Sequence, residues 1–78
     1  HLMPLDWASS TGNLAFAQIE LADRTDDLPL AREALANLTL AEQALRDGGH
    51  IPSAGTFARQ IPDAQALVER LSQGPQPT

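Results

Sequence analysis

His1 and His50 are the only histidines in this chain, which has no cysteine. A protein metal site needs three or four ligands that converge on one point, and the sequence places no such set around His50. We expect His50 to be a solvated residue that follows the end of a helix. The sequence therefore predicts no metal ion.

Hydroxyl side chains stand together at Ser9, Ser10 and Thr11. A nucleophilic hydroxyl needs a neighbouring base, a group that orients this base, and an oxyanion donor. The Gly-x-Ser-x-Gly turn that presents a reactive serine in many hydrolases does not occur in the chain. We predict that the chain has no catalytic residue and is not an enzyme.

Acidic side chains gather at Asp23, Asp26 and Asp27, where calcium binding has to be considered. A calcium loop is punctuated by glycine and ends in a bidentate glutamate. This segment lacks that pattern, so we expect its carboxylates to cap helices. The pair Gly48-Gly49 is not followed by a lysine, and we expect it to end a helix rather than to cradle a phosphate. No cofactor is predicted.

The composition favours helices throughout the chain. Hydrophobic residues make up 42% of the sequence and aromatic residues only 4%. Most of the apolar content is alanine and leucine, which form helices readily. β-Branched and aromatic residues, which favour strands, are too few for a sheet. We predict an all-α fold.

Charge and length exclude several classes of partner. The net charge is −5, and the five basic residues are scattered arginines, whereas phosphate binding needs a clustered cationic face. No apolar run approaches the roughly 20 residues of a membrane span, and no segment has the pattern of an export signal. We expect a soluble cytoplasmic protein that binds neither nucleic acid nor membranes.

Apolar spacing predicts a first helix over about residues 6–23, with Asp6 as its cap. It carries two adjacent apolar stripes, and a helix of this kind is expected to lie between neighbours on both sides. The first stripe consists of Trp7, Thr11, Leu14, Ala15, Leu21 and Ala22, and the second of Ala8, Phe16 and Ile19.

Two further helices are predicted, over about residues 28–47 and 53–72, within a helical domain that covers residues 4–72. Asp26 or Asp27 should cap the first of them, and Ser53 the second. Because apolar spacing continues through Pro62, the last helix is either kinked there or divided into two short coaxial helices. Residues 1–3 are predicted to be a tag remnant or upstream linker, and residues 73–78 a disordered tail. The predicted buried stripe of helix 28–47 is Leu30, Ala31, Ala34, Leu35, Leu38, Ala41 and Leu45.

The segment Pro4-Leu5-Asp6-Trp7-Ala8, followed by Asn13-Leu14-Ala15, resembles the start of a long-period bacterial variety of tetratricopeptide repeat. Ala34, Leu38 and Ala41 match the small, large, small pattern of the second helix of such a repeat. Gln18 departs from it, because an apolar residue or a tyrosine is usual there. The resemblance implies an antiparallel helical hairpin followed by a third, capping helix, at the C-terminal end of an α-solenoid.

The resemblance also implies a function, because the first helix of each such repeat lines a groove that binds peptides or partner helices. The chain would then be a scaffold or protein-interaction module. Without lysine, or any arginine before Arg24, it should not bind an acidic C-terminus at this repeat. The alternative is that Phe16 and Ile19 only pack against a neighbouring repeat. Carried over by position, the protein-binding residues are Ser9, Gly12, Asn13, Phe16, Ile19 and Glu20.

One repeat and a capping helix are fewer than the three or so units that a solenoid needs to bury a continuous core. We therefore expect the isolated chain to self-associate through its first helix. Two other functions remain open: a dedicated helical homo-oligomerisation domain, and a small acidic stand-alone binder or chaperone that begins at Met3.

Overall fold

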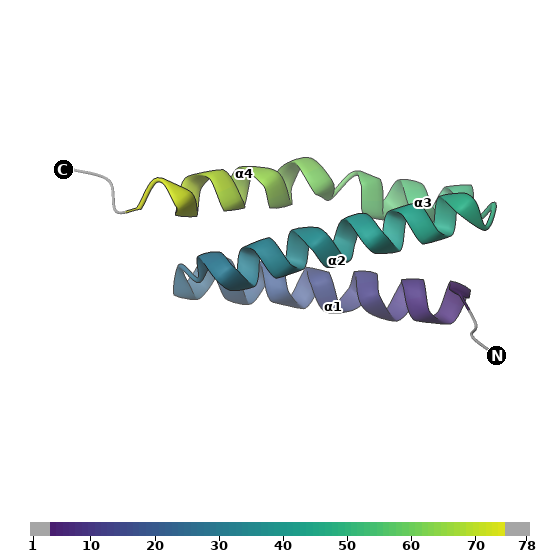
Figure 1. Cartoon of the computed structure of the whole chain (residues 1–78), viewed down its shortest axis with the longest axis horizontal. Helices are drawn as coiled ribbons and strands as arrows, with labels where there is room; N and C mark the ends of the chain where they lie inside the picture. Colours follow the sequence, from purple (N-terminus) through teal and green to yellow (C-terminus); the bar gives the residue numbers. More distant parts are fainter. Residues whose placement is uncertain (1–3, 75–78) are drawn as a thin grey trace.

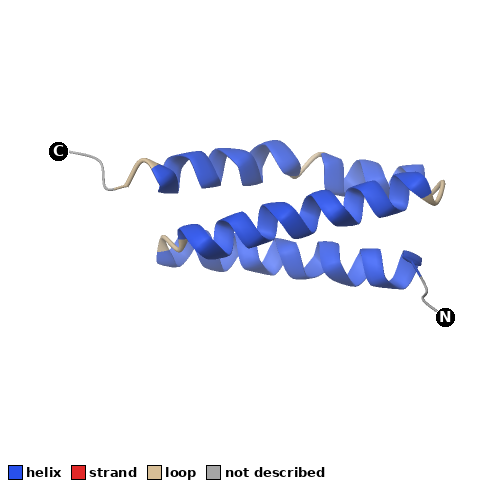
Figure 2. Ribbon diagram, in the orientation of Figure 1, coloured by secondary structure: helices blue, strands red, loops and turns tan. Residues whose placement is uncertain are grey.

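A computed structural model describes the backbone of residues 4–74 and the side chains of residues 6–74. This part of the chain is all-α and contains no strand (Figure 2). The predicted linker at 1–3 and the predicted tail beyond residue 74 lie outside the described residues. The helices are α1 (Pro4–Thr25), α2 (Leu28–Asp47), α3 (Ile51–Ala58) and α4 (Ile61–Ser72).

The helices form an antiparallel hairpin, α1 and α2, followed by a third helical segment that α3 and α4 make together. Figure 1 shows α2 between α1 on one side and the α3–α4 segment on the other. The all-α fold with a hairpin and a third segment, predicted from the sequence, is confirmed. None of the described helices is long and apolar enough to cross a membrane.

Helix α1 begins at Pro4, so the prediction that Asp6 precedes the helix as its cap is wrong. Proline is tolerated in a first turn, where its missing N–H has no partner to lose. Asp6 lies within that turn, where a negative charge interacts favourably with the helix dipole. The helix ends at Thr25, because Asp26 takes the left-handed conformation with φ of 52° and the Asp27 amide donates to the carbonyl of Ala22.

Helix α2 occupies the range expected from the sequence. The carboxylate of Asp27 accepts a hydrogen bond of 3.0 Å from the backbone N–H of Leu30, which makes Asp27 the N-cap. At the other end Gly49 adopts φ of 83°, a left-handed conformation that glycine takes without strain. The expected glycine stop is therefore present.

The third helical segment is divided at Arg59 and Gln60, in agreement with the alternative of two short helices. Pro62 lies in the first turn of α4. The prediction that Ser53 caps this segment is wrong, because α3 begins at Ile51 and its N-cap position is His50. No side chain makes a capping hydrogen bond there. Pro52 is accommodated in the first turn of α3 for the same reason as Pro4 in α1.

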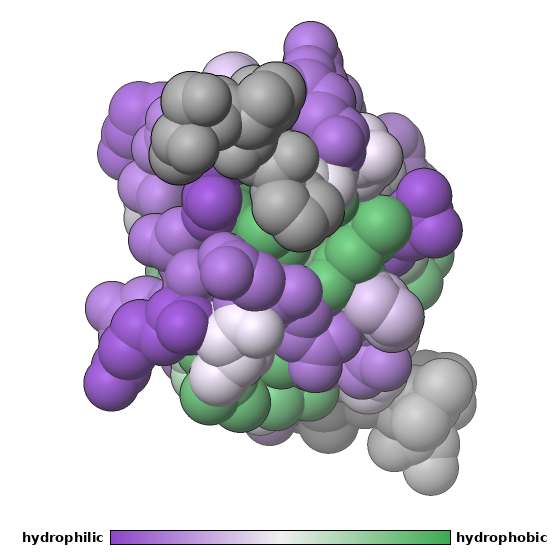
Figure 3. Space-filling model, turned by 90° about the vertical axis from the view of Figure 1, so that its left-hand side faces the viewer, coloured by the Kyte–Doolittle hydropathy of each residue, from purple (hydrophilic) through white to green (hydrophobic). Residues whose placement is uncertain are grey.

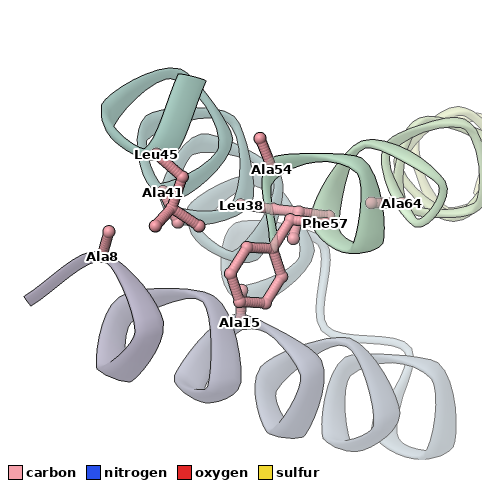
Figure 4. Packing of buried hydrophobic residues seen from close by; sticks show 8 residues of the cluster. All are labelled: Ala8, Ala15, Leu38, Ala41, Leu45, Ala54, Phe57 and Ala64. Atoms are coloured by element: carbon pink, nitrogen blue, oxygen red, sulfur yellow. The ribbon is translucent and has the colours of Figure 1, made fainter. Parts of the chain in front are cut away.

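The core is made largely of alanine, so the helices approach closely. Figure 4 shows Leu38 and Leu45 of α2 beside alanines of the neighbouring helices, and the Phe57 ring projecting from α3 toward α1. Burying each leucine side chain contributes about 1.5–3 kcal/mol. The main cluster of buried residues is Ala8, Ala15, Leu38, Ala41, Leu45, Ala54, Phe57 and Ala64.

The small and the large apolar residues of α1 have different surroundings. Ala8, Ala15 and Ala22 are fully buried. The preceding residue in each case is a large apolar side chain that stays about half exposed: Trp7 47%, Leu14 53% and Leu21 52%. The first predicted stripe is therefore split. Ala15 and Ala22 are covered within the chain, whereas Trp7, Leu14 and Leu21 are not, because they point about 100° away from the face on which the alanines pack.

Candidate functional site

Two hollows lie side by side on the surface between α1 and α3. The smaller, with a volume of about 200 Å³, is lined by Ser9, Asn13, Phe16, Ser53, Thr56 and Phe57. The larger, of about 330 Å³, is lined by Phe16, Ile19, Glu20, Thr56 and Gln60. Because Phe16 and Thr56 belong to both, the two hollows make one groove along the helices, which we call the α1–α3 groove.

The periodicity of each helix places the groove residues on one face. On α1, Ser9, Asn13, Phe16 and Glu20 recur at intervals of three and four residues. The opposite wall repeats this spacing on the α3 side of the groove. Its residues are Ser53, Thr56 and Gln60.

The floor of the groove is an aromatic pair. The ring centroids of Phe16 and Phe57 are 5.3 Å apart and their planes are inclined by 51°, a separation and tilt favourable for aromatic contact. Phe57 is buried and Phe16 is half-buried. The groove therefore offers an apolar base, only part of which the protein itself covers.

Five of the six predicted binding residues line this groove, and the sixth does not. Gly12 is buried, and a Cβ atom built on it would lie 2.4 Å from Cζ of Phe57. Its role is to let the Phe57 ring sit on α1, so its assignment as a surface contact is wrong. The five that line the groove are Ser9, Asn13, Phe16, Ile19 and Glu20.

Phe16 and Ile19 also pack against the hydrophobic core. The sequence left open whether they bind a ligand or only pack a neighbouring repeat. Their neighbours here belong to this chain, since Phe16 contacts Phe57 of α3 and Ile19 lies in a hollow with Leu67 of α4. Both side chains remain half-buried, so packing and exposure to the groove occur together.

The α3 wall was not identified from the sequence. The sequence predicts Ser53 as a helix cap and indicates no role for Thr56 or Gln60. The available signal was Phe57, an apolar residue within the predicted helix 53–72, because Ser53 and Gln60, four and three positions from it, fall beside it at the edge of the same helix face. Knowing that this edge meets α1 required the tertiary structure.

A third hollow extends along α1 toward α4 and is lined by charged residues. Its lining includes Asp23, Asp63 and Arg70. The Arg70 guanidinium donates to Asp23 and lies 3.7 Å from the carboxylate of Asp26. With Glu20 in the adjoining groove, acidic side chains outnumber basic ones on this face.

Gln18, the departure from the repeat pattern, makes a polar link between α1 and α2. Its Nε2 donates to Oε2 of Glu33 at 2.7 Å, and its Oε1 accepts from Nδ2 of Asn37 at 3.0 Å. Among the described residues no buried side-chain nitrogen or oxygen lacks a partner. Gln18 therefore adds hydrogen bonds to the helix pair in place of the apolar contact that is usual in the repeat.

The α1–α3 groove joins an aromatic floor to walls of polar side chains, of which Glu20 is charged. The described residues contain no group of three histidine or acidic side chains placed to hold a metal ion. What the groove can do chemically is hold another chain by apolar contact and hydrogen bonds. Comparison with known proteins finds no family model, curated protein or solved structure that matches this chain.

Proposed function

We propose that the chain is a protein-interaction module that holds an extended peptide segment in the α1–α3 groove. The observation that carries this proposal is the groove itself, in which the Phe16–Phe57 pair lies between two rows of polar side chains. An apolar side chain of the peptide would lie on Phe16 and Ile19. Apolar anchors in partly preformed pockets are typical of peptide recognition.

The groove walls can bind a peptide backbone. Asn13 is an exposed amide on one wall and Gln60 an exposed amide on the other. Each amide side chain has both a donor and an acceptor, which matches the N–H and C=O of an extended backbone. Ser53 and Thr56 add hydroxyl groups between them. Such contacts depend on backbone groups and bind segments of varied sequence.

Charge favours a basic segment. Glu20 lines the groove, and Asp23 and Asp63 line the hollow that continues it toward α4. Arg70 is paired with Asp23, and the chain contains no lysine. Like charges would disfavour an acidic peptide, and complementary charge speeds the encounter with a basic one. The partner in this proposal carries an arginine or lysine next to its apolar anchor.

The resemblance to a tetratricopeptide repeat supports the same function. Ala15 is fully buried, as are Ala34, Leu38 and Ala41, which match the repeat pattern of the second helix. We propose that the chain is the terminal part of such an array in a cytoplasmic bacterial protein, with α3 and α4 as the capping segment. In this proposal the module supplies a binding surface and no catalysis.

Peptide binding tests the proposal. Fluorescence polarisation would compare two labelled extended decapeptides that each contain a central leucine, one flanked by arginines and the other by glutamates. We expect the arginine peptide to bind at least tenfold more tightly. Equal affinity, or no binding of either peptide at millimolar protein, would contradict the proposal.

Two variants with the same change in charge locate the site. Glu20→Lys lies in the groove, whereas Glu69→Lys changes an exposed residue of α4 that lines none of the three hollows. We expect Glu20→Lys to lower the affinity for the arginine peptide at least fivefold and Glu69→Lys to change this affinity less than twofold. Equal effects would show attraction to the whole acidic surface rather than binding in the groove.

A further inference from the structure

The exposed face of α1 carries a seam of large and small side chains that lines none of the three hollows. All members of the seam are exposed. They alternate at intervals of three and four residues, as the a and d positions of a coiled coil do. We call them the α1 seam: Trp7, Ser10, Leu14, Ala17, Leu21 and Arg24.

The α1 seam is held on a well-anchored helix. Ala8, Ala15 and Ala22, each one residue after a large member of the seam, are fully buried. The three large side chains are therefore presented in one row by a helix that cannot rotate to hide them. Figure 3 shows a hydrophobic area at the lower edge of the molecule, where Figure 1 places α1. Large apolar side chains exposed along one face of a small protein are typical of an interaction site.

We propose that a second copy of this chain covers the α1 seam, with the two α1 helices packed antiparallel about a two-fold axis. The register follows from pairing the two leucines of the seam with its two small residues. Leu14 then faces the partner's Ala17, and Ser10 faces the partner's Leu21. This pairing repeats itself on both sides of the axis, as an isologous dimer requires.

Charge selects the antiparallel direction. In the same register Trp7 faces the partner's Arg24, and a guanidinium over an indole ring is attracted to its face. A parallel pair would instead bring the two Arg24 side chains together and leave the small residues, Ser10 and Ala17, opposite their own copies. Antiparallel helices also place the opposite ends of the two helix dipoles side by side. The sequence of the seam is complementary to itself in only one of the two directions.

The size of the seam indicates a weak dimer. From residue 7 to residue 24 the helix rises about 26 Å at about 1.5 Å per residue, with three large apolar side chains on each copy. This contact is smaller than the roughly 800 Å² per partner of a standard stable interface. We therefore expect dissociation at low micromolar concentration and a dimer at several hundred micromolar.

Sedimentation equilibrium and fluorescence of the 78-residue chain test for this dimer. Trp7 is the only tryptophan and there is no tyrosine, so emission reports on the seam alone. We expect a dimer mass at 500 µM and a blue shift of the emission that follows the dimer fraction. A monomer mass at 1 mM would overturn the proposal and leave the seam to a different chain or an upstream segment.

Matched variants show whether the seam makes the contact. Leu40 of α2 is 54% exposed, almost the same as Leu14, and lies outside the seam. We expect Leu14→Glu to weaken dimerisation at least tenfold and Leu40→Glu less than twofold, with unchanged helical circular dichroism. Arg24→Glu and Arg32→Glu provide a second pair, at fully helical exposed positions. If the control variants, Leu40→Glu and Arg32→Glu, weakened dimerisation as much as the seam variants, the proposal would be overturned.

Cross-linking tests the register, since the chain has no cysteine of its own. In the antiparallel pair a cysteine at position 10 faces position 21 of the other copy, whereas identical positions are about 16 Å apart along the axis. A disulfide needs Cα atoms within about 7 Å. A mixture of Ser10→Cys and Leu21→Cys should cross-link at 500 µM, and neither variant should do so alone. Equal cross-linking of Ser10→Cys alone would indicate a parallel pair and overturn the register.

Discussion

The ring of Phe57 lies directly against the backbone of Gly12, so that a Cβ atom at position 12 would come within 2.4–2.8 Å of three ring carbons. This contact joins α3 to α1 and sets the floor of the α1–α3 groove. Phe57 is itself enclosed by the main core cluster, so the ring has little room to move away.

Gly12→Ala is therefore expected to destabilise the fold although alanine is the better helix former. Overpacking against Phe57 should cost about 1–3 kcal/mol, which exceeds the gain of about 0.5–1 kcal/mol in helix propensity. Urea unfolding measures the difference. Gly55→Ala in α3 is the control, because its Cβ would approach only the flexible tip of Arg59, at 4.0 Å. We expect Gly55→Ala to raise the free energy of unfolding, and a stabilised Gly12→Ala would contradict the observed contact.

Ala15→Leu should also destabilise the protein. Ala15 is fully buried in the main core cluster, and added methyl groups in a packed core cost about 1–3 kcal/mol. Ala36→Leu, at an exposed site on α2, should change the free energy of unfolding by less than about 0.5 kcal/mol. Thermal unfolding of both variants gives the comparison, and a neutral Ala15→Leu would mean that α1 and α2 do not pair through this alanine.

The two aspartates between α1 and α2 should respond in opposite ways. Asp26 has φ of 52°, which costs a non-glycine residue about 1 kcal/mol. Asp26→Gly should therefore raise the free energy of unfolding by about 0.5–1 kcal/mol. Asp27→Ala removes the hydrogen bond to the Leu30 amide and should lower it by about 0.5–2 kcal/mol. Chemical unfolding of both variants measures these changes. Equal changes in the free energy of unfolding for Asp26→Gly and Asp27→Ala would mean that the turn differs from the one described.

The ion pair of Arg70 with Asp23, which joins α4 to α1, is expected to contribute little. The two side chains are 51% and 63% exposed, and ion pairs in such surroundings are worth between zero and about 1 kcal/mol. Arg70→Gln should change the free energy of unfolding by less than about 0.5 kcal/mol, with no added dependence on salt between 50 and 500 mM. A loss of 2 kcal/mol would show that the pair holds the α4 end in place.

The helices could be predicted from local chemistry. Alanine, leucine, proline in a first turn, an aspartate cap and a glycine pair act within a few residues of each helix end. The sequence was therefore sufficient for α2, whereas it left open whether the last segment is kinked or divided. Two helix starts were misplaced, at Asp6 and Ser53. A polar residue near a proline predicts a cap, but the prolines here were taken into the first turn instead.

The candidate site could be predicted only in part. Spacing on α1 was enough to bring Ser9, Asn13, Phe16 and Glu20 to one face, because residues three and four apart always share a face of a helix. Spacing could not assign Gly12, since its role depends on a ring 45 positions later in the chain.

Which flank of α1 is covered was decided by tertiary packing alone. Trp7, Leu14 and Leu21 have the same helical spacing as the alanines that follow each of them, and hydrophobicity favours burial of the large residues over that of Ala8, Ala15 and Ala22. The structure buries the alanines, because small side chains let α1 and α2 approach closely and bring Leu38 and Leu45 into the same core. The amino-acid types therefore determined that α1 has apolar surface on two flanks, and only the packing of the three helical segments determined which flank stays open to a partner.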